Sequence, residues 1–116
     1  MATIEYSLID MIANTPTPPY YAVIFTSERT EVGDGYSEAA DRMRELAKGQ
    51  EGFLGIESAR EELGITVSYW NSLDSIRKWK MNAEHLEAQD SGRKHWYENY
   101  KTRICLVERD YQFKKE

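Results

Sequence analysis

Two strand-like segments that follow each other with almost no chain between them limit the fold more than any other feature. The segments are "GFLGIESAR" (52–60) and "GITVSYW" (64–70), and the residues within each alternate in character as in a β-strand. The polar turn "EELG" (61–64) joins them. A connection this short places the two strands side by side and antiparallel. The sequence therefore predicts a β-hairpin in the middle of the chain, with the "REELG" turn as its solvated tip.

A strand and a helix are predicted before the hairpin. "YYAVIFTS" (20–27) is a run of aromatic and β-branched residues, which is typical of a buried strand. Apolar residues then recur at helical spacing and predict a helix over 36–48, with Gly49 as its end.

A helical stretch and a strand are predicted after the hairpin. Ser72 has a side chain suited to capping a helix N-terminus. The helix is expected to bend at "MNAE" (81–84) and to continue to about Tyr100. "RICLVERDYQF" (103–113) then predicts the last strand.

The resulting order, β-α-β-β-α-β, predicts an α+β fold of the ferredoxin-like type, with a four-stranded antiparallel sheet and both helices on one face. Strands 53–60 and 64–70 have apolar residues on both faces. The face of the sheet without helices is therefore expected to meet a second copy of the chain, as a homodimer.

The 116 residues fit one domain over 20–113. The prolines of "TPTPPY" predict an extended N-terminal arm over 1–19. Residues 114–116 are left as a short tail.

Charge and cysteine content exclude several classes of partner. With 20 acidic and 15 basic residues, the chain has a net charge of −5 and no basic surface for nucleic acid. Cys105 is the only cysteine, so an intrachain disulfide is excluded and a reducing cytoplasm is the expected location. "MATIEYSLIDMI" (1–12) has neither a basic start nor a long apolar core, so we expect no signal peptide and no membrane span.

Bulky polar and aromatic residues gather in "EHLEAQDSGRKHWYENY" (84–100). If this stretch is helical, one side of it carries a stripe that an ordinary buried helix would fill with aliphatic residues. The stripe consists of His85, Gln89, Gly92 and Trp96, flanked by Arg93 and Tyr100. It predicts either an interface or the wall of a pocket, whose other wall is the sheet with Tyr21, Val23, Ile56 and Val67.

The order of elements, the "GFLG" entry to the hairpin, the "SYWNSLDSIRKWKMNAEH" run and the "YKTRICLVERDY" strand together resemble the antibiotic biosynthesis monooxygenase family of the dimeric α/β-barrel superfamily. That superfamily includes cofactor-free oxygenases of phenols and quinols as well as haem-degrading oxygenases. The resemblance implies a dimeric barrel and a pocket between sheet and helices. It also implies that Trp79, nine residues after Trp70, reaches into the pocket.

The haem-degrading branch of the superfamily is a poor match. The resemblance places its iron-binding histidine ten residues after the pocket tryptophan, where this chain has Gln89, and His85, one turn earlier, is the alternative ligand. The distal asparagine of that branch is missing from the first strand. No phosphate-binding loop or metal-ligand motif is present either, so we expect no cofactor and no metal.

Cofactor-free oxygenation needs a base, a platform for a flat substrate and donors that stabilise its anion. The predicted catalytic residues are His85, as base, and Trp79, as platform; the predicted substrate-binding residues are Arg93, Tyr97, Gln89 and Tyr100. Each role has a structural alternative. The histidine could make a structural hydrogen bond, the tryptophan fill the core, the arginine form an ion pair, and the tyrosines pack at a dimer interface.

Three functions follow as hypotheses. The first is a homodimeric, cofactor-independent monooxygenase-like protein that acts on a small aromatic or quinol-type compound. The second is a non-catalytic module of the same fold that binds a small ligand or haem. The third is a structural dimer whose interior is filled by side chains and holds no ligand.

Overall fold

The computed structural model describes residues 11–116; the part of the predicted arm before Met11 lies outside the described residues. Between Met11 and Pro19 the chain forms no helix or strand. The elements that follow are β1 (Tyr20–Arg29), α2 (Tyr36–Lys48), β2 (Phe53–Arg60), β3 (Leu63–Trp70), α3 (Leu73–Lys80), α4 (Ala83–Ser91), the π-helical turn η1 (Gly92–Trp96) and β4 (Tyr97–Val107).

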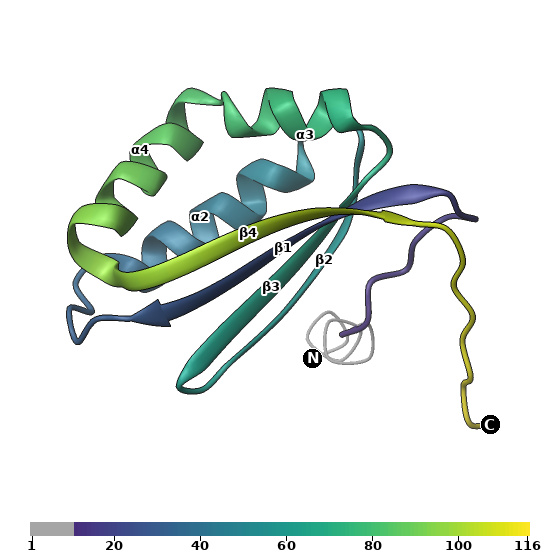
Figure 1. Cartoon of the computed structure of the whole chain (residues 1–116), viewed down its shortest axis with the longest axis horizontal. Helices are drawn as coiled ribbons and strands as arrows, with labels where there is room; N and C mark the ends of the chain where they lie inside the picture. Colours follow the sequence, from purple (N-terminus) through teal and green to yellow (C-terminus); the bar gives the residue numbers. More distant parts are fainter. Residues whose placement is uncertain (1–10) are drawn as a thin grey trace, which may run out of the picture.

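The four strands form one sheet in the order β2-β3-β1-β4, and every neighbouring pair is antiparallel. The helices α2, α3 and α4 lie on one face of this sheet (Figure 1). This is the split βαβ arrangement of a ferredoxin-like α+β fold, as predicted. The predicted bounds of the helix 36–48 are confirmed.

Both α3 and α4 begin at a residue whose side chain caps the helix. Ser72 Oγ accepts a hydrogen bond from the Ser75 backbone N–H at 3.0 Å and begins α3. Asn82 Oδ1 accepts from the His85 backbone N–H at 3.2 Å and begins α4. The predicted capping role of Ser72 and the predicted bend after α3 are confirmed, and the bend brings the start of α4 back beside the end of α3.

A last strand is present as predicted, but the predicted bounds, a helix to about Tyr100 and a strand over 103–113, are wrong. α4 ends at Ser91, η1 follows, and β4 already begins at Tyr97. Gly92 allows this change of direction, since a Cβ there would lie 2.9 Å from the Tyr97 ring. β4 stops at Val107 because its partner β1 begins opposite, at Tyr20, directly after two prolines that cannot donate to a ladder.

Successive side chains of each strand point to opposite faces of the sheet. Val23, Phe25 and Ser27 of β1 face the helices, whereas Ala22 and Ile24 face away from them. The centre of the core is Trp70 at the end of β3, which is fully buried. Replacing a buried tryptophan by alanine costs about 3–5 kcal/mol.

The face without helices, which we call the open face, is partly covered by the chain itself. Glu57 accepts hydrogen bonds there from the Ala13 backbone N–H at 2.8 Å and from the Tyr69 hydroxyl at 2.7 Å. At the same end, the Tyr20 hydroxyl donates to Asp110 of the C-terminal segment, which leaves the sheet on the side away from the helices (Figure 1). The segments before β1 and after β4 are thus fixed to one end of the open face.

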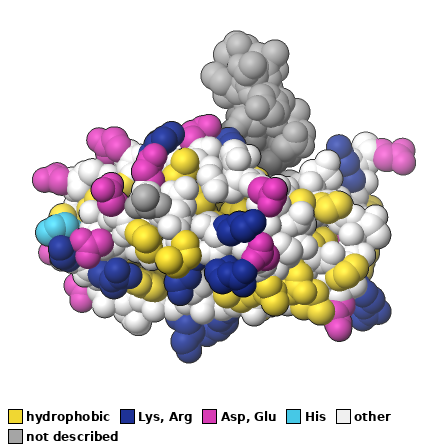
Figure 2. All heavy atoms as spheres, turned by 90° about the horizontal axis from the view of Figure 1, so that it is seen from above, with side chains coloured by type: hydrophobic (Ala, Val, Ile, Leu, Met, Phe, Trp, Pro, Cys, Tyr) yellow, Lys and Arg dark blue, Asp and Glu magenta, His cyan; other side chains and the backbone are white. Residues whose placement is uncertain are grey.

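The outer surface of the helical layer is mixed in charge. Figure 2 looks onto this side, where acidic and basic side chains are interspersed and hydrophobic side chains are exposed between them. The exposed hydrophobic residues include Leu73 of α3 and Leu86 of α4. Within residues 11–116, no helix is long and apolar enough to cross a membrane.

Candidate functional site

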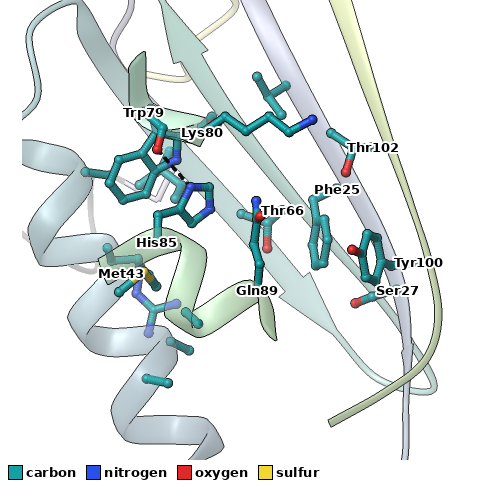
Figure 3. A pocket seen from close by; sticks show the side chains of 18 of the residues that line it. Phe25, Ser27, Met43, Thr66, Trp79, Lys80, His85, Gln89, Tyr100 and Thr102 are labelled. Atoms are coloured by element: carbon teal, nitrogen blue, oxygen red, sulfur yellow. Dashed lines mark hydrogen bonds between the residues drawn. The ribbon is translucent and has the colours of Figure 1, made fainter. Parts of the chain in front are cut away.

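A cavity of about 390 Å³ lies between the sheet and the three helices (Figure 3). Its volume falls in the range of about 300–1,000 Å³ that is usual for small-molecule sites. The space exists because alanines stand where larger residues would fill it: Ala39, Ala40 and Ala47 on α2 and Ala88 on α4. The hypothesis of an interior filled by side chains does not agree with this cavity.

All six predicted site residues line this one cavity. They are Trp79 of α3, His85 and Gln89 of α4, Arg93 of η1, and Tyr97 and Tyr100 of β4. The predicted sheet wall is only partly right. Val23 and Ile56 line the cavity, but Val67 lies on the open face because its neighbours Thr66 and Ser68 point into the cavity.

His85 is held against Trp79 in two ways. The two rings stack, with centroids 4.2 Å apart and planes inclined by 13°. The imidazole Nδ1 also lies 3.0 Å from the Trp79 backbone carbonyl oxygen. Because a carbonyl only accepts, this contact assigns the proton to Nδ1 and leaves a lone pair on Nε2.

The surroundings of His85 keep it neutral at pH 7. Burial lowers the pKa of His85 below its ordinary value of 6.5, and the charge of Lys80 lowers it further. The hydrogen bond to the Trp79 carbonyl acts in the opposite direction. The result is a half-buried, unprotonated imidazole in the cavity wall, which is the state that a general base requires.

The Trp79 ring is not free to stack on a substrate over its whole surface, because other side chains cover part of it. His85 covers one part of it, and the fully buried Trp70 lies near-parallel to it, with centroids 6.0 Å apart. A second aromatic surface comes from the floor of the cavity. There the Phe25 ring lies 5.2 Å from the Tyr100 ring, centroid to centroid (Figure 3). Sequence reasoning read Phe25 only as part of a buried strand.

A β-bulge brings both predicted tyrosines to the same face of β4. Arg29 pairs with Tyr97 and Glu28 with Asn99, so one extra residue is inserted between them. Tyr97 and Tyr100, three residues apart, therefore both reach the cavity. The sequence predicted that both tyrosines lie on a helix, but they reach the cavity from the sheet.

The polar groups around these tyrosines are hydrogen-bond donors. Arg93 Nη1 donates to the Tyr100 hydroxyl at 3.3 Å. Burial raises the pKa of Tyr97, and a hydrogen bond with Tyr36 raises it further, so the phenol keeps its proton. From α4, the Gln89 side chain extends into the cavity, which Thr66 of β3 also lines (Figure 3).

Sequence reasoning missed Arg60. It placed the "REELG" turn in solvent, but the Arg60 side chain folds back across the sheet, where Nη2 donates to Ser27 Oγ and the residue lines the cavity. Gly64 allows this because a Cβ at that position would collide with the guanidinium. Arg60 Nη1 is buried without a hydrogen-bond partner among the described residues.

Two further features complete the site. The Lys80 side chain extends across the cavity toward Thr102 of β4 (Figure 3). In the part of the chain from residue 11 onward, no three His, Cys, Asp or Glu side chains come together as a metal site.

Comparison with known proteins connects this site to a family. The model of the family described as antibiotic biosynthesis monooxygenase matches residues 19–91. A relative from Bacillus subtilis (strain 168), named "Uncharacterized protein YqjZ", is 49% identical over 110 residues, which cover 93% of this chain and 96% of that protein.

Solved structures share the fold at low sequence identity. SnoaB from Streptomyces nogalater, described as a cofactor-independent oxygenase, is 12% identical with a TM-score of 0.64, covering 84% of this chain and 100% of its own. Rv0793 from Mycobacterium tuberculosis is 8% identical with a TM-score of 0.71, covering 80% and 99%. The family model matches more than half of the chain and the Bacillus relative is 49% identical; this chain belongs to the antibiotic biosynthesis monooxygenase family.

Proposed function

We propose that the protein is a cofactor-independent monooxygenase that acts on a small aromatic or quinol-type compound. The observation that carries this proposal is the neutral imidazole of His85, oriented by the Trp79 carbonyl in the wall of the cavity. The family match and the fold shared with SnoaB support it.

The reaction needs only O₂ besides the substrate. His85 Nε2 removes a proton from an activated CH₂ group, such as that of an anthrone, the keto form of a phenol. The anion passes one electron to O₂, and the two radicals join through a C–O bond. The peroxide takes the proton back from His85, then loses water to leave a carbonyl. In total, CH₂ and O₂ become C=O and H₂O, and the substrate supplies all electrons.

The other residues of the cavity bind and stabilise. Phe25 and Tyr100 provide an aromatic surface for a flat substrate. Hydrogen bonds from Arg93, Tyr97 and Gln89 are assigned to the oxygen that becomes negative when His85 removes the proton. Trp79 fixes the orientation of His85 and is a positioning residue in this scheme.

The proposal includes a homodimer formed through the open face. Ile24 and Val67 pair across β1 and β3 there and are only half-buried in a single chain, while Ile65 is 41% exposed. A second copy covering these residues would remove this apolar surface from water and complete a barrel.

Oxygen consumption tests the proposed reaction. The purified protein is incubated with anthrones, hydroquinones and naphthols, beside His85→Ala and the matched control His95→Ala, whose position on η1 is exposed. We expect uptake above the protein-free rate that is lost in His85→Ala and kept in His95→Ala. Ligand binding without oxygen uptake would contradict the proposal and favour the non-catalytic binding module.

A further inference from the structure

We propose that the aromatic ligand of this cavity carries an acid group, such as a carboxylate, and that Arg60 binds it. This inference rests on the proposed function in taking an aromatic compound as the ligand. It adds a charge to that compound and a residue that recognises the charge.

The first argument is the sign of the charges in the cavity. Four lining residues are cationic, namely Arg44, Arg60, Lys80 and Arg93, and among the described residues that line it none is Asp or Glu. The whole chain, by contrast, has a net charge of −5, and the outer helical face mixes both signs (Figure 2). A cavity lined by charges of one sign attracts a ligand of the opposite sign.

The second argument is that three of these four cations have no ion-pair partner among the described residues. Arg44 pairs with Asp41, and Arg93 donates to the Tyr100 hydroxyl, which is uncharged. Arg60 and Lys80 form no ion pair with any residue from 11 to 116.

Arg60 is the residue whose charge most needs a partner. Lys80 is exposed to water, but Arg60 is half-buried and its Nη1 is buried without an acceptor among the described residues. Its Nη2 reaches only Ser27, through the hydroxyl and, at 3.5 Å, the backbone carbonyl. A buried cation with unmatched donors is costly, and a carboxylate supplies both the charge and the acceptors.

The sheet register places this charge at one end of the aromatic floor. Arg60, Gly64, Ser27 and Tyr100 stand in one row across the four strands. Phe25 lies two residues from Ser27 on the same face, about 7 Å away. A ring stacked over Phe25 would therefore present an acid substituent to Arg60.

Binding of 2-naphthoate and of its neutral analogue 2-naphthamide tests the inference. The full chain is titrated with each by isothermal calorimetry at pH 7.5. We expect naphthoate to bind about tenfold tighter or more, because its carboxylate accepts charge-assisted hydrogen bonds from Arg60 that the neutral amide does not match. The preference should weaken as salt is added.

Two arginine variants locate the preference. Arg60→Gln should remove it, whereas Arg77→Gln should keep it, because Arg77 pairs with Asp74 on the exposed side of α3. Circular dichroism establishes that each variant is folded. Equal affinity for the two probes, no naphthoate binding at millimolar concentration, or a preference that survives in folded Arg60→Gln would each overturn the inference; if Arg60→Gln does not fold, the wild-type comparison alone decides.

The binding test of this inference can fail or succeed independently of the oxygen consumption test of the proposed reaction. A preference for naphthoate that depends on Arg60, in a protein that consumes no oxygen, would leave this inference standing and remove the oxygenase. Oxygen uptake with equal affinity for both probes would do the reverse.

Discussion

The His85 imidazole stacks on the Trp79 indole at 4.2 Å and also hydrogen-bonds to the backbone carbonyl of the same residue. Ring packing and hydrogen bonding thus come from one partner. The carbonyl belongs to the main chain, so it remains when the indole is replaced. The tautomer and the ring contact of His85 can therefore be tested separately.

Trp79→Phe should reduce activity far less than His85→Ala. Phenylalanine keeps the carbonyl and an aromatic face, so the lone pair on Nε2 is retained and a loss of about tenfold or less is expected. Loss of the base in His85→Ala should reduce the rate about 10²–10⁴-fold. Steady-state kcat/KM for any substrate that is turned over checks this; equal losses in both variants would show that the indole itself takes part in the reaction.

Acid should destabilise the folded protein through His85. Its pKa is lowered below 6.5 in the folded state, so between the two pKa values the unfolded chain binds more protons than the folded one. The free energy of unfolding should therefore fall as the pH drops below about 6.5, and His85 should contribute no slope well above that pH. Urea unfolding at several pH values between 5 and 8 measures it.

His85→Gln should flatten this part of the pH dependence. The matched control is His95→Gln, since His95 is exposed and its imidazole forms no hydrogen bond with any described residue, the Thr30 hydroxyl donating to its backbone carbonyl instead. We expect the control to keep the wild-type slope. If both variants give the same slope as the wild type, proton binding by His85 is not coupled to folding.

Ala40→Leu should block the cavity without unfolding the chain. The added methyl groups project from α2 into empty space, so they gain apolar contacts instead of forcing the core apart. We expect an unchanged or higher melting temperature together with at least tenfold weaker naphthoate binding. A stable variant that binds as the wild type does would place the ligand elsewhere.

Gly64→Ala should displace Arg60 while leaving its charge in the protein. The new Cβ collides with the guanidinium at the far end of a flexible side chain, which moves more easily than backbone. The bond to Ser27 is then lost, and the preference for naphthoate over naphthamide should fall toward that of Arg60→Gln. A preference as large as in the wild type would show that Arg60 does not need this position.

Ile65→Lys should dissociate the proposed dimer. Ile65 is 41% exposed on the open face, so a single chain tolerates lysine there, but a dimer through that face would bury the new charges. Leu73→Lys is the matched control, because Leu73 is 53% exposed on α3. Sedimentation equilibrium should give a dimer for the wild type and the control; a monomeric wild-type protein at micromolar concentration would refute the interface.

Local patterns were enough to predict most of the fold. The hairpin, the helix 36–48 and the cap at Ser72 depend on residues close together in the chain, so their signals are visible in the sequence. The start of β4 is not local. Tyr97 to Val107 pair along the whole of β1, and this long-range ladder outweighs the helical spacing that continues through Trp96 in the sequence.

The sequence predicted which residues belong to the site better than it predicted their arrangement in space. His85 and Gln89 share one side of α4, as their spacing implied. Arg60 could not be found in this way, because its position depends on Gly64 across the hairpin and Ser27 on a third strand. An arginine in an acidic turn looks solvated until those three positions are seen together.

The bulge in β4 also determines where the chain tolerates a change in length. Glu98 is the extra residue between the pairs Arg29–Tyr97 and Glu28–Asn99, so its deletion would give a regular ladder with Tyr97 and Tyr100 still facing the cavity. A deletion between Thr102 and Val107 would instead turn the rest of the strand over and exchange its two faces. In relatives of this chain, a one-residue gap at Glu98 is therefore structurally silent, and the same gap a few residues later is not.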